Sequence, residues 1–293
     1  MRETFLKKGE IIPLNTDFVF TSIFNNQENI EILEAFLSIY LDDNNIEGNL
    51  KVASRDLRLE SMASRSKQVD LILYRGKDII NIELNNSFTP NLIERNVVYA
   101  CNMHGGQLKY KDNSYREIKS TLQINLNASD KTHSKKLLEQ YSLLEKESGI
   151  ELSKKIQIDI INLQNYDKKC YTLREKKLAR WSKLFLAKTD MELENVIGED
   201  LMKKEVKEKL IEEVKRCSED REFIELYSMY SKEELERNTI LEDEKEEARE
   251  IGREIGLKQG LKEGRKEGLK KGRKEGLKEG KEKGNRRIKK IIY

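Results

Sequence analysis

The sequence predicts an α/β fold in which helices flank one mixed β-sheet, followed by a helical C-terminal extension. Three observations lead to this class. Helix-like and strand-like stretches alternate up to about residue 170, an order typical of a sheet layered with helices. From Tyr171 to about Glu247 the apolar spacing is helical. Beyond Ala248, glycine recurs at every fourth position.

The first half of the chain supplies most of the predicted elements. The stretch NIEILEAFLSIYLDD (29–43) has apolar residues at helical spacing, and LKVASRDLRLES (50–61) alternates as a strand does. The segment VDLILYRGKDIINIELNN (69–86) reads as a hairpin. Thr89 and Pro90 are typical of a helix start, so we expect a helix up to about His104.

Two further strands are predicted at STLQINLN (120–127) and KIQIDIINLQ (155–164), with a helix at 133–147 between them. In the helical part that follows, we expect Trp181, Leu184 and Phe185 to be core residues. The predicted organisation is a folded domain over residues 1–190, a helical segment over 191–247 and a basic repeat tail over 248–293.

Charge is distributed unevenly between these parts. The whole chain of 293 residues has a formal net charge of +3. Residues 248–293 contain 17 Lys and Arg against 7 Asp and Glu, a net of +10, whereas residues 1–247 carry a net of −7. A strongly basic tail indicates a polyanionic partner such as nucleic acid. The chain has no membrane-length apolar run and no signal-peptide pattern, which indicates a cytoplasmic protein without membrane association.

The tail itself has two interpretations. From Gly252 to Gly284 it contains nine glycines at a four-residue period, and each costs a helix roughly 0.5–1 kcal/mol relative to alanine. We favour a partly helical, solvated appendage. The alternative is a glycine face that packs helices together, or a tether for nucleic acid. A coiled coil is disfavoured because heptads are absent.

The hairpin carries two acids whose positions follow from its register. A turn at Gly76-Lys77 pairs residues whose numbers sum to 153, so Asp70 lies opposite Glu83. Gln68, Asn81 and Asn85 share their face, whereas the other face is entirely apolar. Like charges opposite each other are destabilising unless they share a proton or bind a cation.

Oxygen ligands of this kind suit Mg²⁺ or Mn²⁺. We therefore predict a metal site at Asp70 and Glu83, able to activate water and neutralise a phosphodiester. The competing interpretation is a solvent-facing polar edge, with Lys67 or Arg95 supplying the compensating charge.

The ordered motifs resemble a known family. Asp70, separated by twelve residues from Glu83-Leu84-Asn85, is similar to the D…(D/E)-x-K hairpin of the PD-(D/E)XK nucleases. The match is closer to the branch described as PD-(D/E)XK nuclease family transposase, akin to recombination-promoting nucleases. The other matching positions, in order, are Asn15, Asp17, Phe18, Phe20, Phe24, Arg95, Tyr99, Gln107-Leu108 and Tyr115. One residue, Thr16, is inserted between the family's adjacent Asn and Asp.

The resemblance implies a restriction-endonuclease-like fold and a metal-dependent DNA endonuclease. Asp70, Glu83 and the Leu84 carbonyl would bind the metal, and DNA would be the partner. The third position, usually Lys and often Gln in this branch, is Asn85, whose amide is shorter than that of Gln. Asn85 would position water. The family description does not by itself indicate strand transfer.

Four accessory residues have competing roles. Asp17 would either point toward the metal or, as we favour, cap a helix over Phe18–Phe24. Arg95 and Tyr99 lie one helical turn apart and could contact a phosphate, although Tyr99 suits the core equally. Gln68 would orient water or simply line the strand edge.

The rival function is a nuclease fold that lost turnover at Asn85. Such a protein would act as a nucleic-acid-binding or self-associating module, with a homo-oligomer forming through the C-terminal segment.

Overall fold

The structure, a computed structural model, describes residues 6–43, 45–53, 71–87, 89, 91–108, 114–129 and 134–291. Its helices are α1 (Asp17–Phe24), α2 (Ile30–Leu41), α4 (Leu92–Gly105), α5 (Leu173–Leu186), α6 (Asp190–Val196), α7 (Lys204–Glu219) and α8 (Arg221–Ile291). Short 3₁₀ turns are η1 (Gln27–Asn29), η2 (Tyr115–Glu117) and η3 (Leu163–Asn165). The strands are β1 (Leu50–Val52), β2 (Leu71–Arg75), β3 (Asp78–Asn85), β4 (Ser120–Asn127), β5 (Leu138–Leu144) and β6 (Glu151–Asn162).

The described strands form one mixed sheet in the order β1-β2-β3-β4-β6-β5. The central strands β3, β4 and β6 are parallel, and the flanking pairs β1·β2, β2·β3 and β5·β6 are antiparallel. The predicted mixed α/β architecture is therefore confirmed. The carboxyl ends of β3, β4 and β6 meet at one edge, where Asn85, Asn127 and Asn162 lie side by side.

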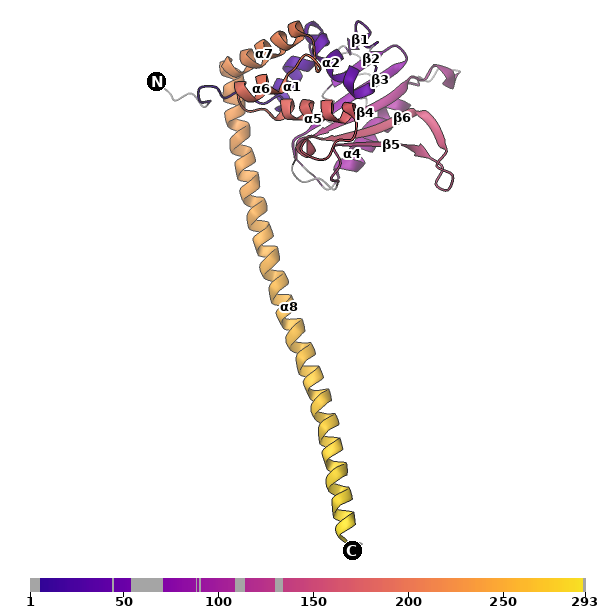
Figure 1. Cartoon of the computed structure of the whole chain (residues 1–293), viewed down its shortest axis with the longest axis vertical. Helices are drawn as coiled ribbons and strands as arrows, with labels where there is room; N and C mark the ends of the chain where they lie inside the picture. Colours follow the sequence, from indigo (N-terminus) through magenta and orange to yellow (C-terminus); the bar gives the residue numbers. More distant parts are fainter. Residues whose placement is uncertain are drawn as a thin grey trace. The chain divides into compact units, whose positions relative to one another are not determined.

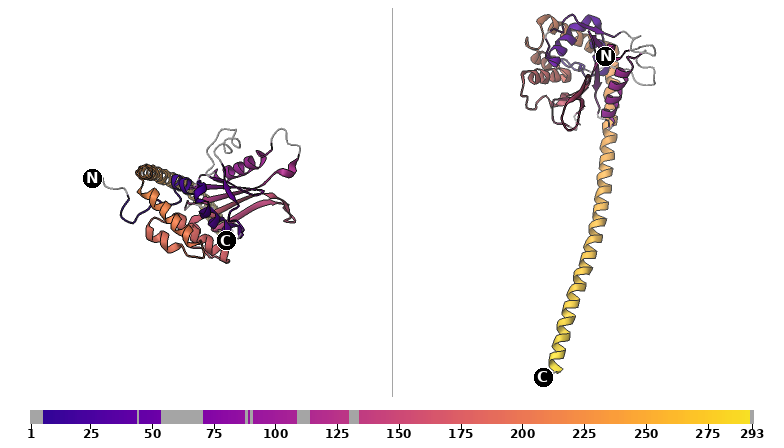
Figure 2. Two further views of the ribbon diagram at one scale, coloured as in Figure 1. Left: turned by 90° about the horizontal axis from the view of Figure 1, so that it is seen from above. Right: turned by 90° about the vertical axis from the view of Figure 1, so that its right-hand side faces the viewer.

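One face of this sheet packs against the main hydrophobic core (Figures 1 and 2). Leu71, Leu73, Ile80, Ile82 and Leu84 point into it, as the hairpin pattern predicts. Helices α1, α2 and α5 cover this face with a cluster of aromatic rings. Its members are Phe20, Phe24, Phe36, Trp181 and Phe185, with Phe36 and Trp181 in an edge-on contact at 5.3 Å between centroids. The predicted core roles of Trp181, Leu184 and Phe185 are confirmed.

Helix α4 lies on the opposite face of the sheet, over β4 and β6 (Figure 2). Its buried residues, Leu92, Asn96 and Ala100, recur every four positions and therefore share one side of the helix. The helix begins two residues later than Pro90, which lies outside the described residues. This face of the sheet is the more polar one.

Two sequence-based expectations are wrong. The predicted helix at 133–147 is instead the edge strand β5, paired antiparallel with β6. The tail, expected to be partly helical, continues as helix through Ile291. The predicted strand at 50–61 begins at Leu50, but its part beyond Ala53 lies outside the described residues.

Tertiary contacts divide the chain into two units, Met1–Ser228 and Met229–Tyr293. In the first unit, the start of α8 packs on the core through Phe223, whose ring centroid lies 5.4 Å from that of Phe18. In the second unit, the described side chains of α8 beyond Ser231 are solvent-exposed. No helix in the described part of the chain is both long and apolar enough to cross a membrane.

Candidate functional site

The site lies on the polar face of the β2–β3 hairpin and its neighbour β4. The observed pairs run from Leu71 opposite Ile82 to Arg75 opposite Asp78, which confirms the predicted register. Gly76 takes a positive φ of 53°, as the tight turn requires. Asp70 and Gln68 lie outside the described residues, so the pairing of Asp70 with Glu83 stays a prediction.

Glu83 is buried, with 5% of its surface exposed. The interpretation of this hairpin face as a solvent-facing polar edge is therefore wrong for Glu83. The parallel pairing of β3 with β4 sets polar side chains next to one another across this face. The three pairs are Asn81 with Gln123, Glu83 with Asn125, and Asn85 with Asn127. All six are buried, and Glu83 is the one ionisable member of this set.

A continuous chain of hydrogen bonds crosses the face and ends at Glu83. Asn81 Nδ2 donates to Glu83 Oε1 at 3.1 Å and to Gln123 Oε1 at 2.7 Å. Gln123 Nε2 donates to Asn125 Oδ1 at 3.1 Å, and Asn125 Nδ2 donates to the Asp159 carbonyl at 3.0 Å. The candidate metal-binding carboxylate is thus held by a side-chain amide.

Asn85 has a cationic neighbour from α4. The guanidinium of Arg95 donates a hydrogen bond to Asn85 Oδ1 and lies 6.0 Å from the ring centroid of Tyr99. Asn85 Nδ2 and Arg95 Nε are both buried and have no hydrogen-bond partner among the described residues. The third motif position therefore carries an amide with an arginine bound to its oxygen.

Two buried asparagines near this position were missed by the sequence reasoning. Asn96 is 1% exposed, and neither of its side-chain polar atoms has a partner in the described part of the chain. Asn127 Nδ2 donates a hydrogen bond to Asn162 Oδ1 at 3.4 Å. The buried Oδ1 of Asn127 has no hydrogen-bond partner among the described residues. Unsatisfied buried polar atoms are rare in folded proteins, and an absent water or ion commonly explains them. For Asn127 the available sequence signal was an asparagine at the carboxyl end of each of the parallel strands β3, β4 and β6.

Asp17 lies at the same end of β3, but it is not an N-cap. Thr16 occupies the N-cap position, and Asp17 is the first residue of α1. Its carboxylate accepts a hydrogen bond from Asn86 Nδ2 at 2.7 Å, and Asn15 donates to Asn86 Oδ1 at 3.2 Å. Desolvation raises the pKa of the Asp17 carboxyl, and the Asn86 hydrogen bond opposes that shift. Because Asn86 follows Asn85, this contact ties α1 to the end of β3.

The donor set available to a metal consists of oxygen atoms. Within the described residues no three His, Cys, Asp or Glu side chains lie close enough to hold an ion. Those residues offer the Glu83 carboxylate, the Leu84 backbone carbonyl and the buried amide oxygen of Asn81. Carboxylate and amide oxygens fit a hard cation such as Mg²⁺ or Mn²⁺ rather than a thiolate-seeking metal.

The mixed sheet and the polar ends of its parallel strands define an α/β protein with a candidate functional site at one edge of the sheet. Over residues 14–244 the chain matches the family model described as PD-(D/E)XK nuclease family transposase, and the protein belongs to that family. The mixed six-stranded sheet of the described residues is consistent with a PD-(D/E)XK α/β fold. No significant match was found among curated proteins or among solved structures.

Proposed function

We propose that this protein is a DNA endonuclease that depends on Mg²⁺ or Mn²⁺, of the recombination-promoting type. One observation carries the proposal: Glu83 is buried on a polar face of the hairpin, whose observed register from Leu71 opposite Ile82 onward is the predicted one. A buried carboxylate must be hydrogen-bonded, paired or bound to a metal to offset the loss of its hydration. A second carboxylate at residue 70 would require either a shared proton or a bound cation, and the oxygen ligands at this face favour the cation.

Asp70, Glu83 and the Leu84 carbonyl would hold the metal. When bound, such a cation neutralises charge on a phosphodiester and makes a coordinated water more acidic. The protein's own contribution is to fix Glu83 in a dry environment and to bring an amide, Asn85, beside it.

Arg95 makes up for the missing lysine in this proposal. Asn85 carries no charge, but its oxygen is bound by the Arg95 guanidinium. The free amide hydrogens of Asn85 would orient water or a phosphate oxygen, while Arg95 supplies the positive charge. Tyr99 keeps the Arg95 side chain in place through the ring contact.

The alternative is a nuclease fold that has lost turnover and acts by binding nucleic acid or by associating with itself. The observation that favours it is Asn85, because an amide at this position stabilises developing negative charge less than an ammonium does. Under this alternative the site would still bind the metal.

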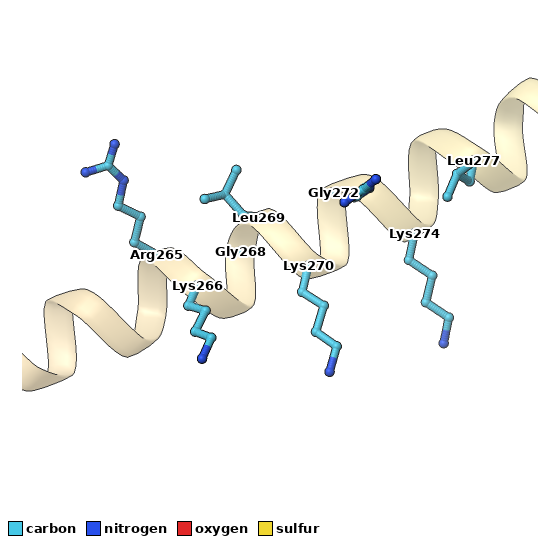
Figure 3. Close-up of a pocket in the computed structure, with 9 residues that line it drawn as sticks. Arg265, Lys266, Gly268, Leu269, Lys270, Gly272, Lys274 and Leu277 are labelled. Atoms are coloured by element: carbon cyan, nitrogen blue, oxygen red, sulfur yellow. The ribbon is translucent and has the colours of Figure 1, made fainter.

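The basic tail is the proposed DNA-binding element in either case. Figure 3 shows Lys266, Lys270 and Lys274 in a row along one side of α8, with Arg265 and Leu269 on another side. Nonspecific affinity for DNA comes mainly from release of counterions by such cations. The glycine positions leave another side of the same helix open for association with a second copy of the tail.

Metal binding and cleavage test the proposal together. We expect Glu83→Ala to abolish Mn²⁺ binding in calorimetry and Mg²⁺-dependent cleavage of plasmid DNA, with the fold retained. Glu94→Ala removes an exposed glutamate of α4 and should change neither. Unchanged Mn²⁺ affinity in both Glu83→Ala and Asp70→Ala would rule out the metal site. Metal binding without cleavage in the wild type, with cleavage gained in Asn85→Lys, would favour the alternative.

A further inference from the structure

The amide chain that ends at Glu83 suggests a role beyond filling space. Its side chains come from β3 and β4, and the exposed fractions of Asn81, Gln123 and Asn125 are 1%, 0% and 0%. The opposite face of the same strands is apolar and packs in the main core. Because apolar residues can pack in a sheet without any hydrogen-bonding requirement, a buried run of amides needs another explanation.

The direction of the hydrogen bonds is fixed from both ends. At one end the Asp159 carbonyl can only accept, so Asn125 must present its N–H and its oxygen faces Gln123. Gln123 then turns its own oxygen toward Asn81, which is left with its amide nitrogen facing Glu83. An ionised carboxylate also accepts only, so each donor meets an acceptor.

We propose that Asn81 and Gln123 are positioning residues, which hold Glu83 Oε1 so that the carboxylate is oriented for a divalent cation. This inference rests on the proposed metal site. The N–H of Asn81 sets the orientation of Glu83, and Gln123 sets the orientation of Asn81. Hydrogen bonds to an ionised carboxylate are stronger than those between neutral groups, so this contact restrains Glu83 more than an ordinary amide pair would.

Asn81 also has a second function in this arrangement. Its Oδ1 is buried and has no hydrogen-bond partner among the described residues, although its Nδ2 has two. A network that served packing alone would not leave an acceptor unpaired next to a carboxylate. If the cation keeps several waters, as Mg²⁺ and Mn²⁺ do when they bind few protein groups, this oxygen would accept a hydrogen bond from one of them rather than bind the cation directly.

The test compares Mn²⁺ affinity in the full-length chain by calorimetry. Asn81→Ala removes the donor and should weaken the dissociation constant about 10- to 100-fold, the range expected when a partner of a metal ligand is lost. Asn81→Ser, which keeps one hydroxyl donor, should recover part of that loss. Gln123→Met, which leaves Asn81 unanchored, should weaken binding in the same direction by a smaller factor.

A matched control separates this role from general destabilisation. Asn29→Ala removes another buried amide, which is 2% exposed and donates to the Ile23 carbonyl, and it should leave the Mn²⁺ affinity within about 2-fold of wild type. Unchanged affinity in Asn81→Ala and Gln123→Met, with binding lost in Glu83→Ala, would overturn the positioning role alone. Unchanged affinity in Glu83→Ala would overturn the metal site and the positioning role together. If Asn81→Ala does not fold, the Gln123→Met and Asn81→Ser affinities decide the question.

Discussion

Replacement of Arg95 by methionine tests whether this arginine of α4 supplies the positive charge that lysine usually supplies at the third position of the family motif. Methionine keeps an unbranched apolar stem but removes the charge and every N–H donor. In the structure, Arg95 donates to Asn85 Oδ1, and Asn85 is 3% exposed. Arg95→Met therefore leaves a buried amide with neither of its polar atoms bonded.

Two magnitudes follow from these contacts. A hydrogen bond that involves a charged group contributes about 1.5–3 kcal/mol, which corresponds to roughly a 10- to 150-fold change in a rate or binding constant. We expect cleavage by Arg95→Met to fall by about that factor if the guanidinium acts in the transition state. The unpaired amide of Asn85 should lower the free energy of unfolding by about 1–3 kcal/mol.

The assay is single-turnover cleavage of plasmid DNA, with the melting temperature measured in parallel. Arg95→Lys keeps the charge but loses the planar guanidinium, so it should retain part of the activity. Arg116→Met, at an exposed arginine of η2, serves as the control and should cleave at the wild-type rate. In an Asn85→Lys background the loss caused by Arg95→Met should shrink to a few fold, because lysine then carries the charge.

A double-mutant cycle decides whether Arg95 acts through Asn85. Coupled residues give effects that do not add, so the Arg95→Met/Asn85→Ala protein should be little worse than Asn85→Ala alone. The reasoning is refuted if Arg95→Met cleaves at the wild-type rate while Asn85→Ala is impaired. It is equally refuted if the fold-decrease in cleavage of the double variant equals the product of the fold-decreases of Arg95→Met and Asn85→Ala, as it does for independent sites.

Three further predictions concern other parts of the chain. Asn85→Gln and Asn85→Lys should raise Mg²⁺-dependent cleavage and Asn85→Ala should lower it, whereas equal rates for all four proteins would remove Asn85 from the mechanism. Burial raises the pKa of Asp159 above 3.8, although hydrogen bonds from Tyr40, Gln140 and Gln157 oppose that shift. The folded state thus binds the Asp159 carboxyl proton more tightly than the unfolded state does. The contribution of the protonated carboxyl to the free energy of unfolding is complete below pH 3.8 and is lost as the pH rises through the folded-state pKa. The melting temperature of Asp159→Asn minus that of wild type should therefore be larger at neutral than at acidic pH, and a difference independent of pH would contradict this. Removal of residues 248–293 should weaken DNA binding and flatten its salt dependence at matched oligomeric state, and an unchanged salt slope would leave assembly as the tail's role.

The hairpin was predictable because its information is local. A glycine turn and strict alternation fix the register, since a slip by one residue would turn every apolar side chain to the other face. The same reasoning placed Glu83 and Asn85 on one face of the hairpin. The Leu84 carbonyl and the Arg95–Tyr99 pair came instead from the family resemblance, and helical spacing then put Arg95 and Tyr99 on one side of a helix.

The strand β5 was not predictable in this way. The segment 133–147 has leucines at helical spacing, and its strand conformation comes from pairing with β6 at the sheet edge, where Tyr141 and Leu143 are about half-exposed. Strand formation depends on such neighbours more than on intrinsic preference. The amide chain was missed for a related reason. Asn81 and Gln123 are 42 residues apart in the sequence, and they come into contact only because β3 and β4 pair in parallel.

The four-residue repeat of the tail keeps its glycines and a set of its lysines on different sides of one helix, so the two proposed roles of the tail, DNA binding and self-association, would not compete. A period of four exceeds the 3.6 residues of a helical turn, so each column of equivalent positions winds by about 40° per repeat. Each repeat has four positions, and each position forms its own column along the helix. The four columns wind together and stay about 90° apart around the helix axis. The glycine column therefore lies opposite the column two residues further on, which contains Lys262, Lys266 and Lys270. A second helix seated on the glycine column would follow the i±4 ridges, which cross at about −50°. The lysine column would then stay exposed to a polyanion, so a dimer would double the cationic surface rather than cover it.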